Sequence, residues 1–99
     1  MAKAYFVYIM TNKYNTVLYT GVTGNLPRRI EAHKRKAVRG FSSRYNVNKL
    51  VYVERYDDPI SAITREKKIK AGSRKKKMEL IDKINDEWKD LSKECDFGL

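Results

Sequence analysis

The alternation of apolar and aromatic side chains near the start of the chain predicts a β-hairpin. Residues 5–10 (YFVYIM) have the two-residue period of a strand, in which neighbouring side chains point to opposite faces. A polar break at residues 11–15 (TNKYN) has the composition of a turn, and residues 16–22 (TVLYTGV) then favour a second strand. The two strands are therefore expected to pair in antiparallel fashion.

A helix is expected directly after this hairpin. Asn25 can cap its first turn, and Pro27 lies where a missing backbone N–H costs little. Arg29 lies four residues before His33, so both side chains project from the same side of the helix and can serve one site. The side chains that follow one face of this helix at helical spacing are Leu26, Ile30, His33 and Ala37.

The middle of the chain predicts a third strand and a second helix. Residues 50–56 (LVYVERY) are rich in β-branched and aromatic side chains, which favours a strand. Asp58 has the chemistry of an N-cap, and Pro59 that of a first helical residue. The helix is expected to run over residues 60–71 and to end at Gly72, a natural C-cap.

The remaining segments predict a loop and one more helix. Residues 38–48 (VRGFSSRYNVN) have no period and are expected to form a loop. Ser73 can cap a long helix whose apolar stripe is most simply part of the core, whereas residues 92–99 lack a pattern and are expected to fray. The stripe consists of Met78, Ile81, Ile84, Trp88 and Leu91.

The order of these elements predicts an α/β fold of the α+β type. A hairpin is antiparallel, and the helix that follows it returns the chain, so the third strand should run with the second and against the first. A small three-stranded antiparallel sheet then needs the first strand in the middle, in the order 2-1-3, with three helices flanking it.

Composition limits the chain to one small domain. Ninety-nine residues with 41% hydrophobic content suffice for one modest core, so we expect a domain over residues 1–91 and a frayed tail over residues 92–99. The single cysteine, Cys95, excludes an internal disulfide and a cysteine-based zinc cluster. With no apolar leader and no apolar run long enough to span a bilayer, the sequence favours a cytoplasmic monomer without a membrane partner.

Charge points to a polyanionic partner, DNA or RNA, because the net charge is +10 and the pI is near 9.8. Residues 28–39 carry +5 and residues 65–77 carry +7, whereas residues 79–96 carry −4. A solvated helix face is the simpler explanation of any single charged run, but two basic helices in so small a chain favour a phosphate-binding surface. The basic residues expected to contact nucleic acid are Arg28, Lys34, Arg35, Arg39, Arg44, Lys67, Lys70, Arg74, Lys75 and Lys76.

The predicted loop over residues 38–48 has two interpretations. Its arginines, Arg39 and Arg44, and its aromatic residues, Phe41 and Tyr45, can hold a strand of nucleic acid by phosphate contacts and stacking. Equally, the two aromatic side chains can pin the loop to the core.

Glu66 is the most unusual residue of the second helix. It lies three residues after Ile63 and three before Ile69, on the face expected to look toward the core. An unpaired buried carboxylate is costly, so Glu66 needs a cationic partner. Lys70, four residues later, can be that partner, and so can a metal ion.

Several residues at fixed spacing resemble the motifs of the GIY-YIG nucleases. Phe6-Val7-Tyr8 stands where that family has Gly-Ile-Tyr, and Tyr19-Thr20-Gly21 stands where it has Tyr-Ile-Gly. The family's arginine, the histidine or tyrosine that follows it, and the metal-binding glutamate match Arg29, His33 and Glu66. Length and layout look most like those of the short stand-alone bacterial members.

The resemblance covers about residues 4–80, and two positions depart from it. Phe6 replaces the first glycine of the family motif, which matters mainly for backbone packing because the tyrosine after it is retained. Val22 stands where some members carry a lysine, so a role for that lysine cannot be carried over.

The resemblance implies hydrolysis of phosphodiester bonds with one divalent ion. Glu66 would be the ligand of Mg²⁺ or Mn²⁺, with the ion binding fully only when DNA or RNA is present. Arg29 would offer its planar fork to the phosphate oxygens as charge builds in the transition state. Tyr8 would help to deprotonate the attacking water, with Tyr19 positioning water or phosphate and His33 accepting or relaying the proton.

Each of these residues also has a simpler explanation. Tyrosines on strands usually pack with an exposed hydroxyl, a single histidine on a half-apolar helix face is usually structural, and Arg29 can belong to the basic patch alone. Three functions therefore stay open: a metal-dependent endonuclease or phosphodiesterase, a non-catalytic nucleic-acid-binding module, and a small accessory protein that docks on an acidic partner. The set of five residues at the family's spacing favours the first.

Overall fold

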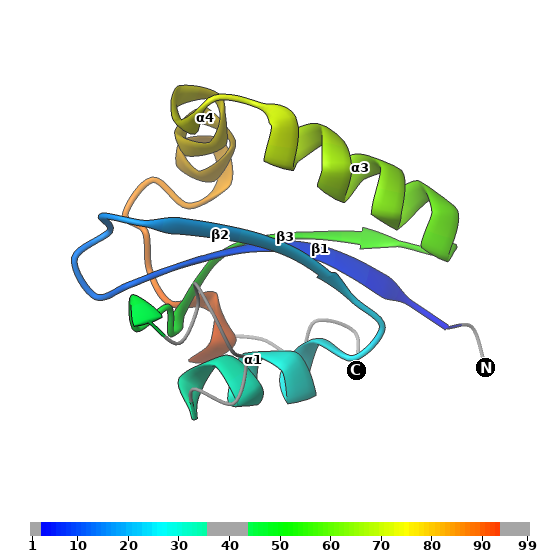
Figure 1. The fold of residues 1–99 in the computed structure, drawn as a ribbon, viewed down its shortest axis with the longest axis horizontal. Helices are drawn as coiled ribbons and strands as arrows, with labels where there is room; N and C mark the ends of the chain where they lie inside the picture. Colours follow the sequence, from blue (N-terminus) through cyan, green and yellow to red (C-terminus); the bar gives the residue numbers. More distant parts are fainter. Residues whose placement is uncertain (1–2, 36–43, 94–99) are drawn as a thin grey trace.

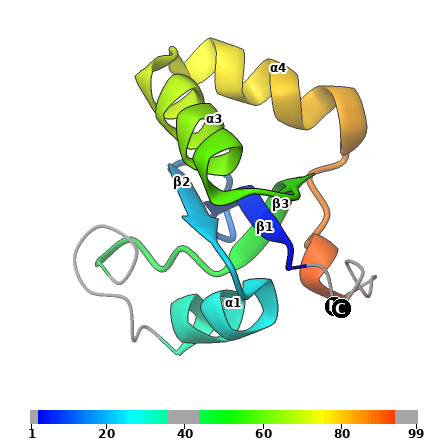
Figure 2. The same cartoon turned by 90° about the vertical axis from the view of Figure 1, so that its right-hand side faces the viewer.

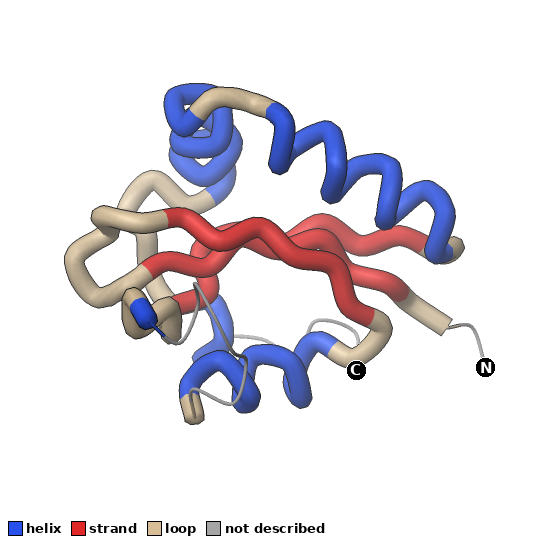
Figure 3. The backbone as a smooth tube through the Cα atoms, in the orientation of Figure 1, coloured by secondary structure: helices blue, strands red, loops and turns tan. Residues whose placement is uncertain are grey.

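The computed structural model describes residues 3–35 and 44–93 of the chain. Its elements are, in chain order, β1 (Tyr5–Thr11), β2 (Leu18–Thr23), α1 (Leu26–Lys34), β3 (Lys49–Tyr56), α3 (Pro59–Ala71), α4 (Arg74–Ile84) and the 3₁₀ helix η1 (Leu91–Lys93). The strands form one antiparallel sheet in the order β2-β1-β3, which confirms the expected α+β fold and strand order. Figure 1 shows α1 on one face of this sheet and α3 and α4 on the other, and Figure 3 shows the sheet as the middle layer.

The central strand β1 is buried on both faces, which explains why residues 5–10 are apolar or aromatic throughout. Because its side chains alternate, it contributes to two separate core clusters. The cluster on the α1 face consists of Phe6, Tyr8, Met10, Leu26, Ile30, Val47 and Leu50. The cluster beneath α3 and α4 consists of Val7, Ile9, Val51, Tyr52, Ala62, Ile69 and Ile81.

The predicted helix starts are confirmed. Asn25, Asp58 and Ser73 each accept a hydrogen bond from a backbone N–H in the first turn of their helix, at 3.2, 2.8 and 3.1 Å respectively. These bonds satisfy donors that have no partner within the helix. Gly72 follows α3 and leads the chain into α4, as the sequence predicts.

The predicted length of the last helix is wrong. α4 ends at Ile84, because Asn85 leaves the helix and its side-chain amide donates to the carbonyl oxygen of Val51 on β3 at 3.1 Å. The same amide donates to the carbonyl oxygen of Lys89 at 2.9 Å, which folds the following residues into a tight turn. A buried side-chain amide with two backbone partners thus outweighs the helical period of the apolar residues around it.

The apolar stripe that the sequence assigns to this one helix is consequently divided. Trp88 has a positive φ of 54°, which no helical residue adopts. Ile81 is buried against the sheet beneath α4, whereas Ile84 is 58% exposed. Leu91 lies in η1 and packs against the core cluster on the opposite face of the sheet.

Part of the predicted loop falls outside the described residues, together with Ala37, Arg39 and Phe41. Of the described loop residues, Val47 belongs to the core, whereas Tyr45 is 41% exposed and has the Arg44 guanidinium 5.7 Å from its ring centroid. Tyr45 is therefore not a core residue. Within the described part of the chain, no helix has the length and apolar character needed to cross a membrane.

Candidate active site

The sheet and α1 bring three of the predicted site residues together. Tyr8 lies on β1, Tyr19 on β2 and His33 on α1, and all three rings meet between the sheet and the helix. The ring centroids of Tyr19 and His33 are 4.9 Å apart, those of Tyr8 and His33 5.8 Å, and those of Tyr8 and Tyr19 6.3 Å. Tyr8 and His33 are buried, whereas Tyr19 is only half-buried. Tyr19 is therefore the ring of this cluster that solvent can reach.

The Tyr8 ring lies where a larger residue at position 21 of β2 would place its side chain. Tyr8 is paired with Gly21 in the register of β1 and β2. A Cβ atom at Gly21 would lie 2.5 Å from Cζ and 2.9 Å from Cε1 of Tyr8, well inside van der Waals contact. The ring therefore lies directly against the backbone of β2, which explains why Tyr19-Thr20-Gly21 ends in glycine.

A hydrogen bond of 3.1 Å joins Oη of Tyr8 to Nε2 of His33. Burial raises the pKa of Tyr8 above its ordinary value and Tyr19 adds to this effect, while the charge of Arg29 and its hydrogen bond to Tyr8 oppose it. Burial, aided by the positive charge of Arg29, lowers the pKa of His33 to about 4. At neutral pH the pair is consequently an uncharged phenol beside an uncharged imidazole.

Arg29 borders a cavity at the start of α1. The cavity has a volume of about 530 Å³ and is also lined by Arg28, by Lys3 and by the end of the β-hairpin. Cationic side chains around one concave surface create a positive potential that attracts phosphate groups. Arg29 thus lies between this basic cavity and the buried Tyr8–His33 pair.

Glu66 lies on α3, across the sheet from α1, as the view in Figure 2 shows for the two helices. Its side chain is 14% exposed, and its Oε2 atom is 3.5 Å from Nζ of Lys70, whose side chain is 59% exposed. The negative charge of Glu66 contributes to the raised pKa of Tyr8, so the two groups interact electrostatically. The ion pair with Lys70 that the sequence allows is therefore present, and the carboxylate is largely buried.

The donor groups around Glu66 define which metal would fit. The described residues contain no group of three or more histidine, cysteine, aspartate or glutamate side chains that could hold an ion together. A single carboxylate fits Mg²⁺ or Mn²⁺, because such ions keep several waters and take substrate phosphate oxygens as further ligands. The set does not fit a structural zinc site, which needs four protein ligands.

Several basic residues that the sequence assigns to nucleic-acid binding already have partners in the structure. Lys34 donates to Asp90 at 3.1 Å and to Ser92 at 2.9 Å, and Arg74 donates to the carbonyl oxygen of Asn15 at 3.2 Å. The other basic residues with a partner are Arg35 (with Glu31), Arg44 (with Tyr45) and Lys70 (with Glu66). Arg28, Lys67, Lys75 and Lys76 are exposed, and Arg39 lies outside the described residues.

The sequence analysis missed a polar cluster that orients α3. Arg65 donates from Nε to Oε1 of Glu54 at 3.0 Å and from Nη2 to Oε2 at 3.1 Å. Tyr52 and Tyr56 also donate hydroxyl hydrogen bonds to this carboxylate. Because Glu66 follows Arg65 directly, the pair fixes the rotation of α3 and with it the direction of Glu66. The available signal is Glu54 itself, the one acidic residue of β3, since a carboxylate in a strand that packs against the core needs a partner.

Comparison with known proteins supports one family. Residues 4–79 match the family model described as the GIY-YIG catalytic domain. A UPF0213 protein of Natronomonas pharaonis is 36% identical over 81 residues, which are 82% of this chain and 94% of that protein. A UPF0213 protein of Clostridium perfringens is 35% identical over 92 residues, which are 93% of this chain and 98% of that protein.

A solved structure has a similar fold over nearly the same length. The solution NMR structure of a UPF0213 protein from Bacillus halodurans aligns with a TM-score of 0.57 and 25% identity, over 92% of this chain and 96% of that one. The segment matched by the family model contains Tyr8, Tyr19, Arg29, His33 and Glu66. The chain therefore belongs to the GIY-YIG family of nucleases, and it matches short members of that family over almost their whole length.

Proposed function

We propose that this chain is a metal-dependent endonuclease that hydrolyses phosphodiester bonds of DNA or RNA. The observation that carries the proposal is the buried hydrogen bond of 3.1 Å between Tyr8 and His33, with Arg29 beside it. Strongly shifted pKa values of titratable groups beside a charged partner and a cavity are typical of catalytic sites. The family supports the same reaction class.

Phosphate is the substrate chemistry that suits the cavity beside Arg29. A guanidinium can donate two parallel hydrogen bonds to phosphate oxygens, and Arg28 and Lys3 add positive charge at the same cavity. As negative charge develops on these oxygens in the transition state, Arg29 would stabilise it more strongly than it stabilises the ground state.

Tyr8 and His33 would remove the proton of the attacking water by a relay. Water would donate its proton to Oη of Tyr8 while Tyr8 passes its own proton to Nε2 of His33, so that Tyr8 never becomes a tyrosinate. This route fits the raised pKa of Tyr8, which makes the tyrosinate costly. A bound phosphate would raise the pKa of His33 from about 4, because its negative charge favours the imidazolium. Tyr19 would orient the water or the phosphate.

Glu66 is the residue that would hold Mg²⁺ or Mn²⁺ when substrate is present. The ion, when bound, supplies positive charge to the phosphate oxygens and lowers the pKa of a coordinated water. Lys70 would give up its ion pair of 3.5 Å with Glu66, at little cost because the Lys70 side chain is 59% exposed.

A second candidate is a nucleic-acid-binding module without catalysis. The observation that favours it is the Glu66–Lys70 ion pair, because an i,i+4 pair can serve helix stability alone. For either function we propose a monomer acting in the cytoplasm on DNA or RNA. Binding to DNA should be mainly electrostatic, so its affinity should fall log-linearly with salt.

The Glu66→Ala variant tests the catalytic proposal. We expect it to abolish cleavage of single- or double-stranded DNA or RNA in Mn²⁺, to fold, and to bind nucleic acid in EDTA as well as the wild type or more tightly. The last expectation follows because the substitution removes a negative charge from a phosphate site. The measurements are a cleavage assay with Mn²⁺ against EDTA, a binding titration in EDTA and a circular dichroism melt.

The matched control is Glu31→Ala, because Glu31 also pairs with a cation four residues later but is 66% exposed on α1. It should leave cleavage and melting close to those of the wild type. A Glu66→Ala protein that melts early, while its folded fraction cleaves at the wild-type rate, would make Glu66 a structural partner of Lys70. Absence of cleavage in the wild type itself, under Mn²⁺ and on every substrate form, would favour the binding module.

A further inference from the structure

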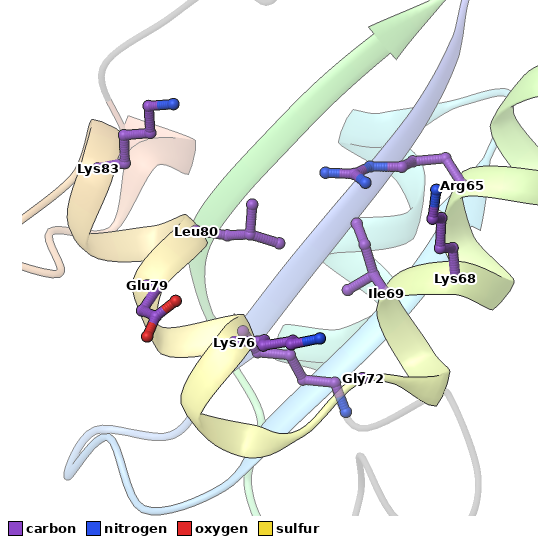
Figure 4. A pocket seen from close by; sticks show the side chains of 9 residues that line it. Arg65, Lys68, Ile69, Gly72, Lys76, Glu79, Leu80 and Lys83 are labelled. Carbon is purple, nitrogen blue, oxygen red and sulfur yellow. The ribbon is translucent and has the colours of Figure 1, made fainter.

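We propose that the groove between α3 and α4 binds a segment of single-stranded nucleic acid, as a site separate from the candidate active site. The groove has a volume of about 450 Å³, within the range of small-ligand pockets. Figure 4 shows Leu80 of α4 and Ile69 of α3 facing one another across it, with Arg65 and Lys68 extending from α3 and Lys76 from α4.

The walls of the groove carry positive charge that the protein does not balance. Lys68, Lys76, Lys77 and Lys83 line it with a single acid, Glu79. Arg65 also lines it, but its charge is already paired with Glu54. Within the described residues, none of these four lysines takes part in an ion pair. Like charges gathered in one concavity repel each other, so an anion bound there would relieve that repulsion.

The floor of the groove is apolar, so the anion that binds there should also have an apolar part. Ile69 is 4% exposed and Leu80 is half-buried, and Gly72, which also lines the groove, adds no side chain to it. Inorganic phosphate has no apolar part to place on such a floor. A nucleotide has both parts, because its base and sugar can cover Ile69 and Leu80 while its phosphates contact the lysines. A single strand presents these parts without the pairing that hides its bases in a duplex.

The lysine by which α3 lines the groove points away from Glu66. At 100° per residue, the side chains of Glu66 and Lys68 point about 160° apart around the helix axis, whereas Ile69 lies about 60° from Glu66. Glu66 interacts with Tyr8 and Lys70, whereas Lys68 and Ile69 line the groove. Lys68 therefore offers a contact that points away from Glu66, and occupancy of the groove does not depend on cleavage.

The test is a titration in EDTA of protein with ¹³C-labelled Ile and Leu methyl groups, using an oligothymidylate of about eight nucleotides. We expect the methyl signals of Ile69 and Leu80 to shift and to saturate. The variant Lys68→Gln/Lys76→Gln should weaken the affinity read from this titration about tenfold, because it removes two charge-assisted contacts. The matched control, Lys13→Gln/Lys89→Gln, makes the same change of charge at two exposed lysines outside the groove lining. It should leave the oligonucleotide concentration that half-saturates the Ile69 and Leu80 signals unchanged.

Three results would overturn the proposal: wild-type Ile69 and Leu80 signals that do not move, equal weakening by both double variants, or saturation of the same signals by ATP at lower concentration than by the oligonucleotide. The last result would assign the groove to a free nucleotide instead of a strand. Inorganic phosphate serves as the further control and should not shift these methyl groups. Because no divalent ion is present, the outcome is independent of whether Glu66→Ala abolishes cleavage.

Discussion

Replacing Gly21 by alanine tests how closely the packing of β2 controls Tyr8. The added Cβ would lie 2.5 Å from Cζ of Tyr8, whereas carbon atoms in contact normally stay about 3.5 Å apart or more. The Tyr8 ring must therefore move by about 1 Å. It is fully buried and hydrogen-bonded to His33 at 3.1 Å, so it cannot move without disturbing that bond.

The expected cost in stability is that of overpacking, about 1–3 kcal/mol. Alanine also restricts the unfolded chain, which favours folding by about 0.4–1 kcal/mol, so the clash should still dominate. For a domain of this size each kcal/mol lowers the melting temperature by about 4–8 °C. If Tyr8 takes part in catalysis, a displacement of about 1 Å should also reduce kcat about a hundredfold.

The measurements are circular dichroism melts and, on the same protein, the Mn²⁺ cleavage assay. Gly24→Ala is the matched control, because its Cβ would meet Cε1 of Tyr5 at 3.6 Å, an ordinary contact. It should be neutral or slightly stabilising. In a Tyr8→Leu background, Gly21→Ala should cost much less than it does in the wild type, because the shorter side chain leaves room. Equal melting temperatures for Gly21→Ala and Gly24→Ala would refute the reasoning.

Substitutions at three other residues test the remaining structural inferences. His33 takes up a proton at pH 6.5 when unfolded but only near pH 4 when folded, so stability should be complete above pH 6.5 and fall as pH drops toward 4, by up to about 1.4 kcal/mol per unit. Urea titrations across this range should show that the free energy of unfolding of His33→Gln depends less on pH than that of the wild type. Parallel curves for the two proteins would contradict the lowered pKa of His33. Trp88→Gly should destabilise less than Trp88→Ala, by about 1 kcal/mol, because φ at this residue is 54° and glycine adopts a positive φ more easily than alanine does. The reverse order in thermal melts would argue against a positive φ at residue 88. Glu54→Gln should cost about 1–3 kcal/mol, because it leaves Arg65 without its charge partner. The cost stays in this range because the side chains of Glu54 and Arg65 are 19% and 31% exposed, so water still solvates the arginine in part. A melting temperature equal to that of the wild type would mean that the pair does not hold α3.

The parts of the fold that depend on local chemistry follow from the sequence. Strand period, cap residues and turn composition are encoded by neighbours in the chain, so the sheet and the helix starts at Asn25, Asp58 and Ser73 are predictable. The end of α4 is not, because it depends on Asn85 reaching the carbonyl oxygen of Val51, a residue 34 positions earlier. An apolar period of 3.6 residues also continues past Ile84 by coincidence, since Leu91 packs on the other face of the sheet.

The candidate site is predictable as a set of residues but not as an arrangement. Motif spacing identifies Tyr8 and His33, yet their hydrogen bond joins positions 25 residues apart and depends on how α1 crosses the sheet. Burial, which shifts both pKa values, also exists only once the core cluster on the α1 face forms. Arg65 illustrates the limit most clearly. In a run of basic residues it has no feature that marks it as the partner of Glu54, because that contact is set by the packing of α3 on β3.

Successive residues of α3 serve different parts of the molecule. Arg65 pairs with Glu54 on β3, Glu66 interacts with Tyr8, and the next turn lines the basic groove beside α4. A helix places neighbouring side chains about 100° apart, so its rotation decides all three directions at once. The partly buried Glu54–Arg65 pair contributes modestly to stability, but its bidentate geometry and two tyrosine hydroxyls allow a narrow range of rotations. In a domain this small, that pair therefore couples folding to the direction of the carboxylate on which catalysis would depend.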